Sequence, residues 1–422
     1  MQDGGTGTEG AGSETVILGA GIVGLCVALS LLERGQAVRL IDRGDPGQAT
    51  SFGNAGVIAP HSNAPHSAPG LWRALPGMLA DPGKPLRVRA ASWPAMIPWG
   101  LRFLARGRAA PFAAGAAAMH ALCAPSIRLY RRHLEAAGQG GLIRDSLYIH
   151  AFRDPAQARL DAPGFRVRAA HGARMERVDG AGLRALEPAV SPDFRAAIVI
   201  EGQARALSPG RIGEVLAGRV RALGGVVERA EITGLVPAGA GWEVATGAGP
   251  RQAAQVVIAA GAWSGHLLAP LGIRLPLMAE RGYHVEIPDP GVTLNHSFTD
   301  VGAAVVASSM EGGLRVAGMA EFGPLDAPPD PARAAILRRV ARGICPDLAD
   351  GEARIWMGRR PSLPDSLPAL GRIAGRPGLW AAFGHSHHGL MMAPATGEAI
   401  AALITGADPG IDMAPYDPGR FG

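Results

Sequence analysis

The chain has 422 residues, of which 47% are hydrophobic and 18% are charged. This is the composition of a folded protein with ample apolar mass for a large core, and it excludes both a small disulfide-stapled module and a disordered chain. The 41 basic residues are interspersed with 36 acidic ones, so the net charge of +5 comes without a long basic tract, and we expect no nucleic-acid partner.

The cysteines and the N-terminal residues indicate a reducing compartment. Cys26, Cys123 and Cys345 are widely spaced and show neither a disulfide pattern nor a metal-binding pattern. Residues 1–13 are small, polar and acidic, without the apolar core of an export signal, and are expected to form a disordered tail. The alanine-rich stretch 109–127 is interrupted by prolines, so we expect no transmembrane segment.

The first strong motif is a strand, a glycine turn, a helix and a second strand. Residues 15–18 are apolar and β-branched, residues 25–34 have helical spacing, and residues 37–41 form a second apolar run that ends at Asp42. The turn between the first strand and the helix reads Gly19-Ala20-Gly21-Ile22-Val23-Gly24. A glycine-rich turn alone is weak evidence, but this complete unit predicts a bound ADP group.

Each part of this motif has a physical role in binding a dinucleotide. Gly19 permits the tight turn, Gly21 lets the backbone approach a pyrophosphate, and Gly24 lets helix and strand pack closely. Amides at the helix start bind phosphate, and Asp42 accepts hydrogen bonds from ribose hydroxyls, which favours FAD or NAD over NADP. The expected contacts in this part of the chain are Gly19, Gly21, Ile22, Val23, Gly24, Asp42 and Arg43.

The segment after Asp42 distinguishes FAD from NAD. A nicotinamide dehydrogenase normally continues into another helix here, but residues 49–60 are too small, polar and glycine-rich to form one. Such a segment suits hydroxyl and amide contacts around an extended ligand, although an ordinary loop is the alternative. The candidate contacts are Thr50, Ser51, Asn54, Ala55 and Gly56.

These segments resemble the start of flavin-dependent D-amino acid dehydrogenases, within the D-amino acid oxidase family that also holds glycine and sarcosine oxidases. Residues 256–264 resemble the family's second flavin motif. Ser208 is the expected N-cap of a helix ending at Leu223, which leads into the strand that passes the adenine in the family. The contacts that this resemblance implies are Val227, Ala260, Gly261 and Trp263.

The resemblance implies an α/β fold with a Rossmann-like FAD-binding domain interleaved with a second, α+β substrate domain. We expect the FAD-binding domain to comprise residues 14–60, 207–270 and 352–410. The substrate domain would comprise residues 61–206 and 271–351.

The C-terminal third holds the residues implied for the substrate. Residues 357–365 resemble the family's Gly-x-Arg-Pro segment, whose arginine holds the substrate carboxylate, and this points to Arg360. A planar guanidinium makes two parallel bonds to a carboxylate, and a structural ion pair is the alternative role. Residues 281–287 resemble a family strand that crosses the substrate side, so Tyr283 or His284 is expected to touch the substrate unless that tyrosine is merely packed.

A histidine-rich turn follows the strand expected at residues 379–383. In the family this turn and the start of the next helix, expected from Pro394 to Ile404, lie beneath the flavin, with the positive helix end facing its N1 and C2-oxygen edge. The implied contacts are Gly384, His385, His387, His388 and Gly389, with His387 also placed at the reaction site. A metal site is the alternative, but no carboxylate or cysteine stands at ligand spacing, so we expect no metal.

The implied reaction is hydride transfer from an amino acid α-carbon to the flavin N5, giving an imino acid that water hydrolyses to a 2-oxo acid. No side-chain base is required. The arginine segment lacks the cysteine that attaches flavin in some relatives, so we expect non-covalent FAD. Lys84 is the single lysine, which disfavours an oxidase that uses a lysine beside the flavin and favours electron transfer to a quinone or carrier protein.

Other functions stay open at this point. The chain could oxidise a secondary amine such as D-hydroxyproline, sarcosine or glycine, as a dehydrogenase or an oxidase. It could also be a nicotinamide-dependent dehydrogenase, or a protein that binds FAD without catalysis. The expected location is the cytoplasm, with peripheral contact to the inner membrane left open.

Overall fold

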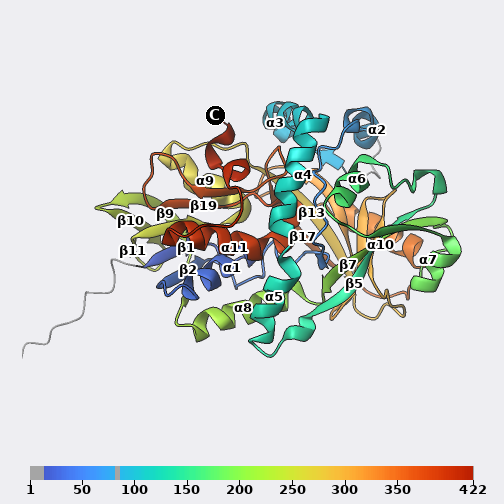
Figure 1. Cartoon of the computed structure of the whole chain (residues 1–422), viewed down its shortest axis with the longest axis horizontal. Helices are drawn as coiled ribbons and strands as arrows, with labels where there is room; N and C mark the ends of the chain where they lie inside the picture. Colours follow the sequence, from blue (N-terminus) through green and yellow to red (C-terminus); the bar gives the residue numbers. More distant parts are fainter. Residues whose placement is uncertain (1–13, 81–85, 422) are drawn as a thin grey trace, which may run out of the picture.

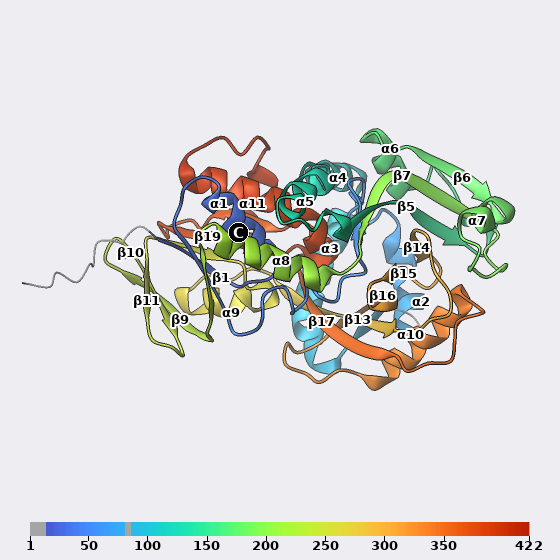
Figure 2. The ribbon, with the colours of Figure 1, turned by 90° about the horizontal axis from the view of Figure 1, so that it is seen from below.

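The computed structural model describes residues 14–80 and 86–421, and the grey trace in Figure 1 marks the remainder. The tail expected at residues 1–13 and the single lysine, Lys84, lie outside the described residues. Figure 2 shows two lobes side by side along the long axis of the molecule.

A six-stranded sheet forms the core of the first lobe. The predicted strand–helix–strand unit is confirmed as β1 (Thr15–Leu18), α1 (Ile22–Leu32) and β2 (Val38–Asp42), and all four residues of β1 are buried. The sheet is parallel except at β18, which pairs antiparallel with β19. In spatial order its strands are β18 (Ala369–Arg372), β19 (Leu379–Phe383), β12 (Gln255–Ile258), β1, β2 and β8 (Val226–Arg229).

The strand order places a ligand crevice at the end of β1. The chain leaves β1 toward β2 on one side, whereas β12 pairs with the other side of β1. Ligands of open α/β sheets bind where the strand order reverses in this way, outside the carboxyl ends of the strands. The turns after β1 and β12 therefore lie together at the same edge.

Helices cover this sheet. The helix α1 is apolar on all sides because it packs between the sheet, α8 (Pro209–Ala222) and α11 (Gly389–Thr405). The helices α4 (Ala109–Cys123) and α5 (Ser126–Glu135) pack against α11. By length and composition the stretch Ala109–Glu135 could cross a membrane, but core helices meet the same criteria, and Met119, Leu122 and Tyr130 are buried in the shared core.

The helix α11 begins five residues earlier than Pro394, where the sequence places its start. Proline has no amide hydrogen, so Pro394 leaves the carbonyl oxygen of Leu390 without its helical donor. The hydroxyl of Tyr130 in α5 donates to that oxygen at 2.7 Å. This replacement bond lets the helix extend back to the histidine turn and brings its N-terminus to the site described below.

A ten-stranded sheet forms the second lobe. Most of its pairings join segments that are far apart in the chain, which is why sequence patterns do not reveal them. Along the main path its strands are β17 (Arg354–Ser362), β13 (Met278–Ile287), β16 (Gly313–Phe322), β15 (Val305–Met310), β14 (Ser297–Asp300), β5 (Ile143–Phe152), β7 (Ala196–Ala206) and β3 (Val57–Ile58), while β4 (Leu86–Val88) pairs with β16 and β6 (Met175–Asp179) with β7.

Smaller elements complete the fold. A three-stranded sheet lies at the far end of the first lobe (Figure 1), and α9 (Ser264–Leu268) follows β12 along the chain. The helices α2 and α3 lie on the same side of the molecule (Figure 1). The bounds of the remaining elements are β9 (Ile232–Ala238), β10 (Gly241–Thr246), β11 (Arg251–Ala253), α2 (Leu75–Ala80), α3 (Trp93–Arg106), α6 (Pro163–Ala170), α7 (Gly180–Leu186) and α10 (Pro331–Ile344).

Several elements lie on the other side of the expected domain boundaries. The sequence division places residues 352–410 in the FAD-binding domain, whereas β17 is the edge strand of the large sheet and pairs with β13. It also assigns residues 61–206 to the substrate domain, whereas α4 and α5 share the apolar core of the first lobe. In both cases a non-local contact decides the position, and local sequence patterns do not encode such contacts.

Candidate active site

A cavity of about 1130 Å³ is lined by residues of both sheets. Its wall includes the turns after β1 and β12, the loop 49–55, parts of β13 and β17, the histidine turn 385–388 and the start of α11. The volume exceeds the roughly 300–1,000 Å³ of an ordinary small-molecule pocket. The cavity therefore accommodates a dinucleotide together with a second ligand.

The nucleotide end of the cavity is built around Asp42 at the end of β2. Its Oδ2 accepts the amide of Ala20 at 2.8 Å, and its Oδ1 accepts the amide of Gly44 at 2.9 Å. An ionised carboxylate has about four acceptor positions, so roughly two remain for ribose hydroxyls. A Cβ atom at Gly24 would lie 2.0 Å from the carbonyl oxygen of Gly19, so glycine alone allows this close packing of helix on turn.

The loop 49–56 is fixed from both lobes. Ser51 Oγ accepts the amide of Ile22 at 3.0 Å, which ties the loop to the start of α1. From the large sheet, Nη1 of Arg315 donates to the carbonyl oxygens of Phe52 at 2.7 Å and Asn54 at 2.9 Å. Arg315 is itself held by Glu286. The predicted contact loop is thus a rigid part of the cavity wall.

Two arginines flank the indole of Trp263, which follows β12. The Cζ atom of Arg43 lies 4.5 Å from the ring centroid, and that of Arg359 lies 5.5 Å from it. The carbonyl oxygen of Arg359 also accepts a hydrogen bond from Thr50 Oγ1 at 3.0 Å. Cation–π contacts of this kind hold the indole beside the loop and contribute positive charge to this part of the wall.

Arg360 of β17 extends across Gly282 of β13. A Cβ atom at Gly282 would lie 2.2 Å from Cζ of Arg360, so the guanidinium lies directly against the strand backbone. Its Nη1 donates to Oε1 of Glu280 at 2.9 Å and to the carbonyl oxygen of Met319 at 2.8 Å. Within residues 14–80 and 86–421, Nε and Nη2 have no hydrogen-bond partner. The Nε–Nη2 edge of the guanidinium has the geometry to donate two parallel hydrogen bonds to a carboxylate.

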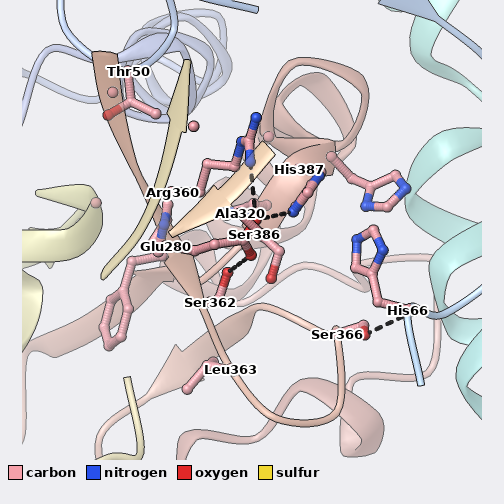
Figure 3. A pocket seen from close by; sticks show the side chains of 18 of the residues that line it. Thr50, His66, Glu280, Ala320, Arg360, Ser362, Leu363, Ser366, Ser386 and His387 are labelled. Atoms are coloured by element: carbon pink, nitrogen blue, oxygen red, sulfur yellow. Dashed lines mark hydrogen bonds and ion pairs between the residues drawn. The ribbon is translucent and has the colours of Figure 1, made fainter. Parts of the chain in front are cut away.

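Glu280 is the centre of the polar cluster in Figure 3. Its carboxylate accepts hydrogen bonds from Arg360, from Ser362 Oγ at 2.9 Å and from Nε2 of His387. Burial alone would raise its pKa, but His387, Arg360 and His66 together hold the pKa well below its usual range. Glu280 is therefore a carboxylate at neutral pH, and it orients both Arg360 and His387.

Four histidines surround this cluster, and two of them, His385 and His388, are buried. The ring centroid of His66 lies 4.4 Å from that of His387 and 5.1 Å from that of His388. Burial lowers the pKa of His66 and of His385 to about 3, and it lowers the pKa of His388 well below its ordinary value. Nε2 of His385 is 3.0 Å from Thr396 Oγ1. Among the described residues, no group of three or more His, Cys, Asp or Glu side chains could hold a metal ion.

Comparison with known proteins identifies the family. The profile of the FAD dependent oxidoreductase family DAO matches residues 14–403. The chain belongs to this family. A D-amino-acid oxidase of Bradyrhizobium diazoefficiens is 36% identical, with 97% of this chain and 99% of that protein covered. A D-amino acid dehydrogenase of Paramagnetospirillum magneticum is 32% identical, with 97% of this chain and 99% of that protein covered.

Solved structures with the same fold include other flavoenzymes. A glycine oxidase from Geobacillus kaustophilus has a TM-score of 0.75 at 21% identity, with 97% of this chain and 99% of that chain covered. An L-proline dehydrogenase from P. horikoshii has a TM-score of 0.73 at 21% identity, with 97% of each chain covered. At these identities the likeness concerns the fold alone. It confirms the predicted D-amino acid oxidase-like fold of this DAO-family member.

The cavity fits the FAD of the DAO family. The glycine turn leaves room for a pyrophosphate, because a Cβ at Gly21 would meet only Ser51 Oγ at 3.6 Å. Asp42 offers its spare acceptor positions to the ribose. Cys26, Cys123 and Cys345 are buried, and none of them lines the cavity, which favours the predicted non-covalent binding.

Most of the residues expected at the site line the cavity. These are Gly19, Gly21, Ile22, Val23, Asp42, Arg43, Thr50, Ser51, Asn54, Ala55, Ala260, Gly261, Trp263, Tyr283, Arg360, His385, His387, His388 and Gly389. Five of the expected residues do not: Gly24, Gly56, Val227, His284 and Gly384. Glu231 and Ile232, which follow β8, line the wall in place of Val227. The roles of all these residues in DAO-family catalysis stay predictions.

Neither Tyr283 nor His284 presents a free polar group to the cavity. The hydroxyl of Tyr283 donates to Glu321 Oε2 at 3.0 Å and accepts the amide of Asp330 at 3.2 Å. The ring of His284 is buried, stacks on Trp356 at 5.0 Å between centroids and lies 3.1 Å from the carbonyl oxygen of Gly53 through Nδ1. Tyr283 thus ties β13 to β16 and to the start of α10, and His284 holds the loop 49–56 against the large sheet.

Sequence patterns alone do not single out Glu280 or His66. Glu280 lies directly opposite Arg360 in the pairing of β13 with β17, and this register is invisible in the sequence. Glu280 directly precedes the strand expected at residues 281–287. A strand extended by this one residue places Glu280 on the same face as Gly282, which is the signal that the sequence offers.

Proposed function

We propose that the chain oxidises the bond between the α-carbon and the nitrogen of a D-amino acid, giving an imino acid that water hydrolyses to a 2-oxo acid. The unpartnered edge of Arg360 carries this proposal, because it offers two parallel donors to an α-carboxylate inside the cavity. The D configuration is inferred from the D-amino-acid oxidase and D-amino acid dehydrogenases among the curated relatives.

The residues of the cavity would bind and orient the substrate. FAD, when bound, supplies the acceptor for the two electrons that leave the substrate. Arg360 fixes the position and tilt of the amino acid through its carboxylate, and Glu280 keeps the guanidinium in place. Glu280 has about one acceptor position left after its three hydrogen bonds, and this position is available to a substrate amine.

Anaerobic reduction of the purified holoenzyme tests this function. The flavin absorbance is followed after addition of D- and L-amino acids, proline derivatives or N-methylglycine. We expect bleaching by D-amino acids and formation of the matching 2-oxo acid. Bleaching by secondary amines alone would replace this function with amine oxidation. An unchanged spectrum with every compound would overturn it.

We also propose that the electrons pass to a quinone and that the protein binds the membrane surface peripherally from the cytoplasm. The support is the α2–α3 surface, which we define as the exposed apolar side chains Trp72, Leu79, Trp93, Ile97, Leu101 and Leu104. Such a concentration of exposed apolar residues is unusual on a monomeric soluble protein and typical of interaction sites. Both helices also line the cavity.

The charge around the α2–α3 surface favours an anionic bilayer over a protein partner. Residues 71–108 contain six arginines, one lysine and a single acid, Asp81, and two of the arginines, Arg87 and Arg89, are paired with carboxylates. Arginines beside exposed tryptophan and leucine side chains are the pattern of a segment that lies in the interface of an anionic membrane. A lipid-soluble acceptor would then reach the cavity without crossing water.

A further inference from the structure

Arg168 is a cation in the cavity wall that has no anionic partner among the residues that the structure describes. It projects from α6 beside Tyr148 of β5, and both residues line the cavity. Its Nη1 donates to the carbonyl oxygen of Gly164 at 2.8 Å, whereas its Nε is buried without a hydrogen-bond partner. Throughout residues 14–80 and 86–421, no carboxylate forms an ion pair with Arg168.

Two buried arginines of the large sheet are neutralised by carboxylates. Arg281 pairs with Glu321 at 2.8 Å, and Arg315 pairs with Glu286 at 2.7 Å. A guanidinium removed from water without an anion is costly, and it stays protonated at any ordinary pH. Burial lowers the pKa of Arg168, which reflects the same cost. The chain thus maintains an uncompensated positive charge at this point of the cavity.

The surroundings of Arg168 do not supply the missing charge. Burial, reinforced by Arg168, lowers the pKa of His150 to about 3. Burial also lowers the pKa of His61 and of His388, and Arg168 adds to both effects. These histidines are therefore neutral at physiological pH. The positive charge of Arg168 is therefore not balanced by its neighbours, and it favours anionic ligand groups at this end of the cavity.

Arg168 and Arg360 belong to the same cavity. His388 is close enough to Arg168 to feel its charge, and its ring lies 5.1 Å from that of His66. His66 in turn contacts His387, which binds Glu280 beside Arg360. Both arginines therefore line one cavity, and the neighbouring rings of His388 and His66 are within electrostatic range of Arg168 and Arg360, respectively.

We propose that Arg168 binds a second carboxylate, carried by the substrate side chain, so that acidic D-amino acids are the preferred substrates. This inference rests on the proposed function, because it assigns the α-carboxylate to Arg360. Hydrogen bonds to a charged group contribute about 1.5–3 kcal/mol each, which corresponds to a preference of roughly 10- to 100-fold over a neutral isostere.

Substrate pairs of matched shape test the preference. The holoenzyme is reduced anaerobically with D-aspartate against D-asparagine and with D-glutamate against D-glutamine. We expect the acidic member of one pair to have a ~10- to 100-fold higher kcat/KM. Reduction by the neutral member at an equal or higher rate in both pairs overturns this inference and leaves the proposed function intact. No reduction by any amino acid overturns both.

Variants of two arginines on one helix separate charge recognition from a structural role. Arg168→Met removes the charge and keeps much of the volume, while Arg166→Met changes an exposed arginine on the same helix. We expect Arg168→Met to lose the preference for acidic substrates, while kcat/KM for neutral substrates changes less than ~3-fold. Arg166→Met should keep the preference for acidic substrates. An equal loss for acidic and neutral substrates would assign Arg168 a structural role and overturn the inference.

Binding of non-reacting acids provides a readout that needs neither turnover nor a variant. Glutarate and butyrate have similar apolar parts, and glutarate carries a second carboxylate. Titration of the flavin spectrum of the holoenzyme should give a Kd for glutarate that is ~10-fold or more below that for butyrate. Equal Kd values would show that the cavity has no second carboxylate site.

Discussion

Glu280 and Arg360 face each other across the antiparallel strands β13 and β17 and are joined through a single guanidinium nitrogen, Nη1. A bidentate pair would have consumed the edge that a substrate carboxylate needs. The single contact instead fixes the plane of the guanidinium against Gly282 and leaves Nε and Nη2 available. Arg360 can therefore form a structural ion pair, its alternative role in the sequence analysis, and still bind a substrate carboxylate.

Arg360→Leu should lower kcat/KM for the preferred amino acid by ~100-fold or more, because two charge-assisted hydrogen bonds of about 1.5–3 kcal/mol each are lost. Most of the change should appear in KM, since the carboxylate is held before and during reaction. Steady-state kinetics with a dye acceptor measures both constants. FAD content, read from the absorbance ratio, should stay near that of the wild type.

Arg359→Leu is the matched control for this variant. Arg359 is the neighbouring residue, but its guanidinium lies over Trp263 and not beside Glu280. It should weaken FAD retention more than it raises KM. A wild-type KM in Arg360→Leu, or an equal rise in KM in both variants, would show that Arg360 does not bind the substrate carboxylate.

The sequence reveals the nucleotide half of the site far better than the substrate half. The turn Gly19–Gly24, Asp42 and the loop 49–56 are contiguous segments whose roles depend on local backbone geometry, so their patterns can be read directly. The position of Glu280 opposite Arg360 depends on the pairing of two strands that are separated along the chain by α10 and three further strands. Local patterns contain no information on such a register.

The histidine turn illustrates the same limit. The sequence shows three histidines in residues 385–388 but not that they differ in environment. His385 and His388 are buried, whereas His387 reaches Glu280, and His66 joins them from a segment more than three hundred residues away along the chain. Only the packing of α11 against α5 and the loop near residue 66 brings these rings together.

Asp42→Ala should raise the Kd of FAD by ~10- to 100-fold. The carboxylate contacts the amides of Ala20 and Gly44, so its removal loosens the glycine turn as well as deleting the expected ribose contact. Recovery of flavin fluorescence on dilution measures the release of FAD. Asp45→Ala changes an exposed acid three residues later and should leave the Kd unchanged. Equal Kd values for wild type and Asp42→Ala would exclude the contact.

Trp72→Ser combined with Leu101→Ser should weaken binding to phosphatidylglycerol vesicles by at least ~10-fold, because each side chain would otherwise bury an apolar surface worth about 1.5–3 kcal/mol. Co-sedimentation with vesicles measures the effect, and FAD retention reports on folding. Added salt should weaken wild-type binding through the arginines.

Val236→Ser is the control for the membrane surface, because Val236 is an equally exposed apolar residue on the distant three-stranded sheet. Its vesicle binding should match that of the wild type. Wild-type protein that stays in the supernatant with anionic vesicles at low salt would refute the membrane contact.

His284→Gln should flatten the dependence of stability on pH between about pH 6.5 and 4. Burial, followed by the charge of Arg315, lowers the pKa of His284 to about 3 in the folded protein, against about 6.5 in the unfolded chain. The unfolded chain therefore binds a proton that the folded protein excludes. The contribution of His284 is complete above pH 6.5 and is lost as the pH falls toward 3.

Urea unfolding of the holoenzyme at pH 7 and pH 5 measures this effect. One proton taken up on unfolding corresponds to about 1.4 kcal/mol per pH unit, so the wild type should lose about 2 kcal/mol more than His284→Gln between these pH values. The variant loses the stacking on Trp356 at both pH values, which cancels in the comparison. Parallel losses in the two proteins would show that His284 titrates normally, and the buried position of its ring against Trp356 would then be wrong.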